Sequence, residues 1–278
     1  MQKIKSYSVF LLVFILLLTS CSEYQKVLNK GTATDQYKLA TELYEKGKYN
    51  KAIALFEKII PSYQRKPQME RIQYMVAESN FKVKNYDLAA YYFNRFIGNY
   101  PSSSRIEEAA FLVAMSYYLN SPKSSLDQSE TEKAMSAFQS FIDKYPNSEK
   151  AVEANNYYDE LVKRLEKKSF DIAKQYYQTE NYKAAVVAFD TFLEDNFGTS
   201  YKEDAMGYKF MAAYQLGMKS IFVKKEERLN DAIAMYKRFE KEFPKSDKLK
   251  QFASLYDNLN KELISTEELQ AKLDNNGL

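Results

Sequence analysis

The chain has 278 residues, of which 45% are hydrophobic and 28% charged, and it contains one cysteine and no histidine. The absence of histidine excludes histidine-based catalytic triads and the common zinc sites, and the seven glycines never cluster into a phosphate-binding loop. With 40 basic and 37 acidic side chains it lacks the basic excess typical of nucleic-acid-binding proteins, so we expect no enzyme, cofactor, metal site or nucleic-acid partner.

The N-terminal segment has the layout of an export signal. Two lysines precede an unbroken apolar run over residues 9–18, which is too short to span a bilayer, since spanning takes about twenty apolar residues. Residues 18–21 (Leu-Thr-Ser-Cys) resemble the lipobox of bacterial lipoproteins, in which the cysteine is acylated and the chain is cut just before it. We therefore predict a signal peptide over 1–20 and a lipid on Cys21. The alternative is an ordinary cleavage site beside a free cysteine.

Residues 21–34 are mostly polar and show little apolar periodicity, so we predict a lipidated tether there. Beyond it the sequence repeats itself. A pattern of alanine, aromatic, aromatic, alanine and aromatic recurs with spacings of 4, 5, 3 and 4 residues. The full copies are Ala40, Tyr44, Tyr49, Ala52 and Phe56, then Ala77, Phe81, Tyr86, Ala89 and Phe93, then Ala173, Tyr177, Tyr182, Ala185 and Phe189, and partial copies contain Ala134 and Ala232.

These spacings predict pairs of antiparallel helices. Steps of three and four residues place the side chains on one helix face, and the step of five holds the turn between two helices. Sparse glycine and proline also favour helices over strands. Small alanines let the paired helices approach closely while aromatics fill the space beside them. We therefore predict an all-α solenoid of about five helix pairs, similar to tetratricopeptide repeats.

The ends of the units set the predicted domain boundaries. An aromatic residue followed by proline closes three units, at 100–101, 145–146 and 243–244, whereas the fourth has Asn-Phe-Gly-Thr at 196–199. Residues 120–129 are predicted to form an inserted loop. The predicted parts are repeats one to three over 35–147, an extra junction helix over 148–168, repeats four and five with a closing helix over 169–264, and a polar tail over 265–278.

The lipobox and the five units together resemble the BamD family of lipoproteins, over about residues 35–218. The matching runs are Asp87-Leu88-Ala89 with Phe93, Arg95-Phe96-Ile97, Tyr100-Pro101 and Tyr145-Pro146-Asn147-Ser148. The resemblance implies a lipid-anchored protein on the periplasmic face of the outer membrane, which binds a BamA-like barrel subunit and unfolded barrel precursors. Two alternatives remain: a repeat lipoprotein that coordinates cell-wall synthesis or division, and a glycan-capturing lipoprotein, although the chain lacks the tryptophans that usually stack on sugars.

In repeat arrays the first helices of the units line a groove that holds extended peptides. The positions that match peptide-facing sites of tetratricopeptide repeats are Tyr37, Thr41, Tyr44, Glu45, Arg71, Tyr74, Glu78 and Phe81. We expect Tyr44 and Phe81 to lie in the core. The predicted groove residues are therefore Tyr37, Thr41, Arg71, Tyr74 and Glu78.

Overall fold

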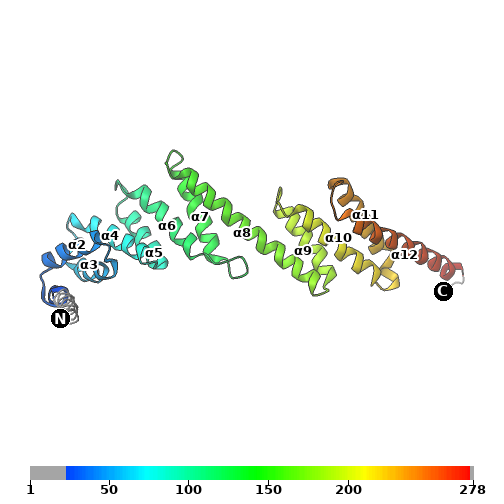
Figure 1. Ribbon diagram of the computed structural model, residues 1–278, viewed down its shortest axis with the longest axis horizontal. Helices are drawn as coiled ribbons and strands as arrows, with labels where there is room; N and C mark the ends of the chain where they lie inside the picture. Colours follow the sequence, from blue (N-terminus) through cyan, green and yellow to red (C-terminus); the bar gives the residue numbers. More distant parts are fainter. Residues whose placement is uncertain (1–22, 276–278) are drawn as a thin grey trace, which may run out of the picture. The chain divides into compact units, whose positions relative to one another are not determined.

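The computed structural model describes residues 23–275, and every regular element in them is a helix (Figure 1). The helices form five consecutive pairs, called units 1–5 here, followed by α12. The pairs are α2 (Ala33–Glu45) with α3 (Tyr49–Tyr63), α4 (Gln68–Lys82) with α5 (Tyr86–Asn99), α6 (Ile106–Asn120) with α7 (Ser129–Lys144), α8 (Ala151–Gln178) with α9 (Tyr182–Asp195), and α10 (Lys202–Met218) with α11 (Phe222–Glu242); α12 is Leu249–Asn275. The predicted all-α fold of helix pairs is confirmed.

Each unit is held together by aromatic rings between its two helices. The first helix contributes an aromatic residue three positions before its alanine, and in units 2–5 this residue is at most 6% exposed. These residues are Tyr74, Phe111, Phe170 and Phe210. In unit 4, for example, the ring of Phe170 lies 5.9 Å from that of Phe189 and 5.7 Å from that of Phe192, between centroids. Such edge-to-face pairs add about 0.5–1.5 kcal/mol to the burial of their apolar area.

Three of the units use one residue with a positive φ angle in the turn between their two helices. In units 1, 2 and 4 this residue lies seven positions after the first-helix alanine. It is Gly47 (φ 70°), Lys84 (φ 64°) or Glu180 (φ 60°). The next backbone N–H then donates to a carbonyl near the helix end, as Asn85 does to Asn80 at 2.9 Å, which is the Schellman ending of a helix.

Replacing Lys84 with glycine is therefore expected to raise the free energy of unfolding by about 0.5–1 kcal/mol. A side chain in the left-handed region costs roughly 1–2 kcal/mol, part of which the flexibility of unfolded glycine cancels. The reciprocal change, Gly47→Ala, should lower stability by a similar amount. Urea titration followed by circular dichroism measures both, and a destabilised Lys84→Gly protein would contradict this interpretation of the turn.

A second hydrogen bond recurs where each of units 2–5 ends. A serine or threonine hydroxyl donates to a glutamate on the same unit's first helix, which ties the exit turn to that helix. The pairs are Ser103 to Glu70 at 2.6 Å, Ser148 to Glu107 at 2.5 Å, Thr199 to Glu166 at 3.2 Å and Ser246 to Glu203 at 2.6 Å. The fourth unit lacks the aromatic-proline pair, yet it keeps this contact, and Gly198 with φ 84° makes its turn.

The helix predicted over 148–168 is part of a longer one. The structure has a single helix, α8, from Ala151 to Gln178, which includes the first helix of unit 4. No glycine or proline interrupts this stretch, so nothing ends the helix at residue 168. The chain divides into two compact parts within α8, between Leu161 and Val162.

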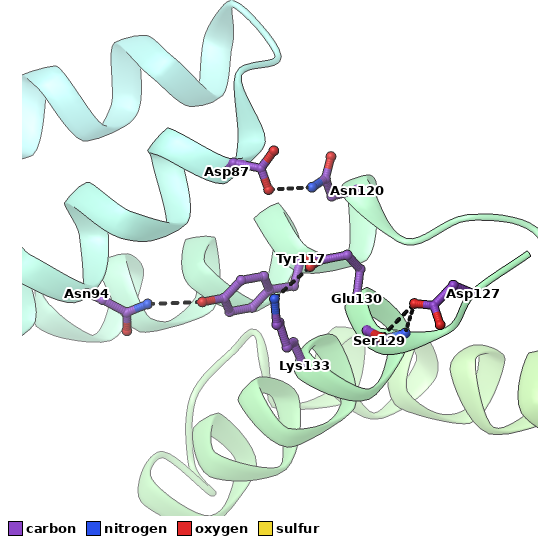
Figure 2. Close-up of polar contacts among 8 residues, drawn as sticks. All are labelled: Asp87, Asn94, Tyr117, Asn120, Asp127, Ser129, Glu130 and Lys133. Carbon is purple, nitrogen blue, oxygen red and sulfur yellow. Dashed lines mark hydrogen bonds and ion pairs between the residues drawn. The ribbon is translucent and has the colours of Figure 1, made fainter.

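The loop over residues 120–129 is ordered by its own polar groups. The Gln128 side chain is 5% exposed, and its amide donates to the carbonyl oxygens of Lys123 at 3.0 Å and Leu126 at 2.9 Å. Figure 2 shows both ends of the loop held by side chains: Asn120 donates to Asp87 of α5 at 2.6 Å, and Ser129 donates to Asp127. The start of the insertion is therefore tied to α5 of unit 2, and the bonds from the Gln128 amide and the Ser129 hydroxyl lie within the loop itself.

Two terminal segments differ from their sequence-based predictions. Residues 23–30, expected within a tether over 21–34, are helical and pack on unit 1. Near the other end α12 continues through Asn275, where a polar tail was expected from residue 265; Thr266 is 6% exposed. Within residues 23–275 no helix has both the length and the apolarity needed to cross a bilayer. The predicted signal peptide and Cys21 lie outside the described residues.

Candidate peptide-binding surface

The two predicted groove residues on α2 lie side by side along one helix face. The ring of Tyr37 is half-buried and stacks on Tyr63, with 5.4 Å between centroids and 27° between planes. The hydroxyl of Thr41 donates to the backbone carbonyl of Tyr37 at 3.0 Å, so it does not donate a hydrogen bond to a peptide while this bond is intact. Tyr37 can therefore offer a ring edge to a peptide, while Thr41 can offer only an acceptor oxygen.

The two charged residues predicted on α4 both contact α2. One guanidinium nitrogen of Arg71 lies 3.6 Å from a carboxylate oxygen of Glu45, and these side chains are 53% and 64% exposed. An ion pair this exposed contributes little to stability, so both groups stay accessible to another charged or polar partner. The carboxylate of Glu78 accepts a hydrogen bond from the Tyr44 hydroxyl and lies 4.0 Å from the ammonium of Lys82.

Tyr74 does not belong to an accessible groove. Its side chain is 1% exposed, and its ring packs edge-on against Phe93 and Phe96 at 5.8 and 5.4 Å. Burial, followed by the hydrogen bond that its hydroxyl donates to Glu108, raises the pKa of Tyr74 far above its usual value. The guanidinium of Arg105 covers the other side of the ring at 4.4 Å. Tyr74 is the core aromatic of unit 2.

Tyrosine–glutamate pairs connect successive first helices in the N-terminal part. The hydroxyls of Tyr44, Tyr74 and Tyr118 donate to carboxylates on the next first helix. The acceptors are Glu78 on α4, Glu108 on α6 and Glu160 on α8, the last at 2.7 Å. Burial and then the hydrogen bond to Glu78 also raise the pKa of Tyr44, so the Tyr44 and Tyr74 hydroxyls are protonated donors at neutral pH. The pairs fix the register of the first helices.

Glu108 and Arg105 were not identified from the sequence as surface residues. The repeat spacing, however, indicates Glu108. Arg71 and Glu108 each lie six positions before a first-helix alanine, at Ala77 and Ala114, and both are exposed. Alignment of unit 3 on Ala114 would have placed Glu108 next to Arg71 along the surface. The candidate surface is therefore defined by the first-helix side chains Tyr37, Glu45, Arg71, Glu78 and Glu108 together with Arg105 at the entry to α6.

This surface is suited to binding rather than to chemistry. Its carboxylates can accept backbone N–H groups of an extended chain, and its two guanidinium groups can donate to backbone carbonyls. The ring of Tyr37 adds an apolar contact at one end. Within the described residues no group of three or more acidic, cysteine or histidine side chains is arranged to hold a metal ion.

Comparisons with known proteins give a family and one relative. The family model YfiO, described as an outer membrane lipoprotein, matches residues 29–229. The outer membrane protein assembly factor BamD of Rickettsia prowazekii (strain Madrid E) is 31% identical over 103 residues, which are 37% of this chain and 41% of that protein. The aligned stretch thus spans less than half of that relative.

Solved structures with a similar chain course are helical-repeat proteins. The TPR2AB domain of yeast Sti1, in a pHSP90 complex, is 13% identical and covers 82% of this chain and 98% of its own, with a TM-score of 0.39. A thermophilic tetratricopeptide-repeat protein of Thermus thermophilus is 17% identical and covers 81% and 98% of the two chains, with a TM-score of 0.32.

Proposed function

Because this chain belongs to the YfiO family of outer-membrane lipoproteins, we propose that it is a non-catalytic scaffold of β-barrel protein assembly. In this proposal a lipid on Cys21 holds it on the periplasmic face of the outer membrane. It binds a BamA-like barrel subunit and unfolded barrel precursors. The observation that carries the proposal is the row of exposed charged side chains on the first helices of units 1–3, at which no catalytic constellation is assembled.

The two partners are assigned to different parts of the chain. The candidate surface in residues 23–161 takes the precursor, since an unfolded strand presents unpaired N–H and C=O groups that carboxylates and guanidinium groups can satisfy. Units 4 and 5 take the barrel subunit. The name of the Rickettsia relative, an outer membrane protein assembly factor, supports a role in assembly in general.

Peptide binding tests the proposal. A double variant, Arg71→Ala with Glu108→Ala, should weaken binding of a fluorescent peptide copied from a strand of an outer-membrane barrel protein by about tenfold or more. Both side chains are exposed and can contact a peptide directly. Because Glu108 also accepts the hydrogen bond of the buried Tyr74 hydroxyl, urea titration of the variant separates lost stability from lost binding. Fluorescence anisotropy measures the affinity, and circular dichroism checks the fold.

The matched control removes one arginine and one glutamate from second helices, by Arg95→Ala with Glu132→Ala. Both side chains are exposed, on α5 and α7. This control should bind the peptide as the unchanged protein does. Equal affinity of the first-helix variant and the unchanged protein would remove precursor binding from this surface.

A further inference from the structure

Side chains of α2 and α3 hold the helical segment over residues 23–30 against unit 1. The amide of Gln36, which is 5% exposed, donates to the backbone carbonyls of Val27 and Leu28, both at 3.1 Å. The ammonium of Lys58 on α3 donates to the Leu28 carbonyl as well. At the start of the segment the ring of Tyr24 lies under the ammonium of Lys51, 5.0 Å from its centroid. The segment is therefore fixed along α3.

This packing shortens the connection between a lipid on Cys21 and the folded chain. The packed segment begins at residue 23, two positions after Cys21, and two residues reach at most about 7 Å. A flexible tether over 21–34 would allow about 45 Å at full extension. The inference rests on the lipid that the proposed function places on Cys21. With that lipid in the bilayer, unit 1 lies directly at the membrane surface.

Unit 1 also differs from the rest of the chain in charge. Residues 23–67 contain nine basic and five acidic side chains, whereas residues 68–278 contain 29 basic and 32 acidic ones. Four exposed lysines lie on the packed segment and on the helix that it follows. They are Lys26, Lys30, Lys51 and Lys58, called the basic face here.

The five acids of residues 23–67 lower the charge of this unit without cancelling it, and one of them, Glu23, lies on the packed segment itself. The carboxylate of Asp35 accepts hydrogen bonds from the backbone N–H and hydroxyl of Thr32, which holds it at the start of α2. Glu57 of α3 accepts a hydrogen bond from the Tyr92 hydroxyl of α5 at 3.3 Å. Glu42 forms an ion pair with Lys46 at the end of α2. The basic face keeps its positive charge.

We propose that the basic face lies on the anionic phospholipid headgroups of the membrane that holds the acyl chains. Ammonium groups act as point charges for phosphate, and each one near an anionic membrane surface favours binding by several-fold. The short connection holds the start of the basic face beside the headgroups, where the attraction between ammonium and phosphate is screened least. The contact sets which side of unit 1 faces the bilayer, and it leaves the candidate peptide-binding surface a fixed distance from the membrane.

Vesicle binding of the unacylated mature chain tests this contact without its anchor or any partner. The Cys21→Ser protein should cosediment with phosphatidylcholine vesicles containing about a quarter phosphatidylglycerol at low salt, but not with pure phosphatidylcholine vesicles. Replacing Lys26 and Lys30 with glutamate should weaken that binding by at least about 30-fold, because two attractions are removed and two repulsions added. Circular dichroism should show an unchanged fold, since both side chains are exposed.

The matched control makes the same charge change far along the chain, at the exposed residues Lys245 and Lys250, and should weaken binding by less than about threefold. Equal losses in the two variants, or equal binding to neutral and anionic vesicles, would overturn the membrane contact. Either result would leave the scaffold function in place. The peptide-binding result for the Arg71→Ala, Glu108→Ala variant does not bear on whether the basic face contacts phospholipid headgroups.

Discussion

Replacing Phe170 with alanine is expected to lower the unfolding free energy of residues 162–278 by about 3–5 kcal/mol, the usual cost of removing a buried phenylalanine ring. Phe170 is 6% exposed, and its ring contacts four other rings. These belong to Phe189, Phe192, Tyr201 and Tyr208, with centroids 4.9–6.1 Å away. Without the ring, α8 and α9 lose their common core.

The same chain offers a matched control for this prediction. Phe197 is 99% exposed, so Phe197→Ala makes the same chemical change with almost no loss of burial and should cost less than about 0.5 kcal/mol. Because repeat arrays unfold in segments, hydrogen exchange of each part measures the effect better than one global transition. Equal losses at the two positions would contradict the assignment of Phe170 to the core of unit 4.

Replacing Cys21 with serine is expected to move the protein from the membrane fraction to the soluble fraction. Each buried methylene of an acyl chain contributes about 0.8 kcal/mol of membrane affinity, so a multiply acylated cysteine supplies far more than the four lysines of the basic face. The fold should not change, because the described core begins beyond residue 22. Cell fractionation measures the distribution, and circular dichroism of the purified protein measures the fold.

Ser22→Ala is the control for this experiment, since it alters the neighbouring residue and leaves the acceptor cysteine in place. It should stay in the membrane fraction. Membrane retention of the Cys21→Ser protein at physiological salt would show that another element anchors the chain. Unfolding of that protein would show that anchor and scaffold are not separable.

The repeat pattern predicted the fold well because its alanines and most of its aromatics are core residues at equivalent positions of each unit. Ala40, Ala77 and Ala173 are fully buried at helix crossings, as their spacing indicated. The pattern did not separate core from groove at Tyr74. Tyrosine suits both environments, and only comparison with Phe111 and Phe170 at the same repeat position reveals a core position.

Contacts between segments far apart in sequence were less predictable. The hydrogen bond of Thr199 to Glu166 spans 33 residues. Thr199 alone does not identify its partner, and only comparison with the serines that end units 2, 3 and 5 shows that the contact persists at the unusual turn over 196–199. Residues 23–30 look like a tether because only a few of their side chains are apolar. Their helix is stabilised instead by Gln36 and Lys58, which lie outside the segment.

Cross-linked purification of the acylated chain from its own cells is the most direct test of the scaffold function. We expect it to recover a barrel-forming outer-membrane protein with periplasmic domains, together with barrel precursors. Cross-links to the precursors should fall in the Arg71→Ala, Glu108→Ala variant. Recovery of cell-wall synthesis or division proteins alone, with no barrel-forming partner, would contradict a role in β-barrel assembly.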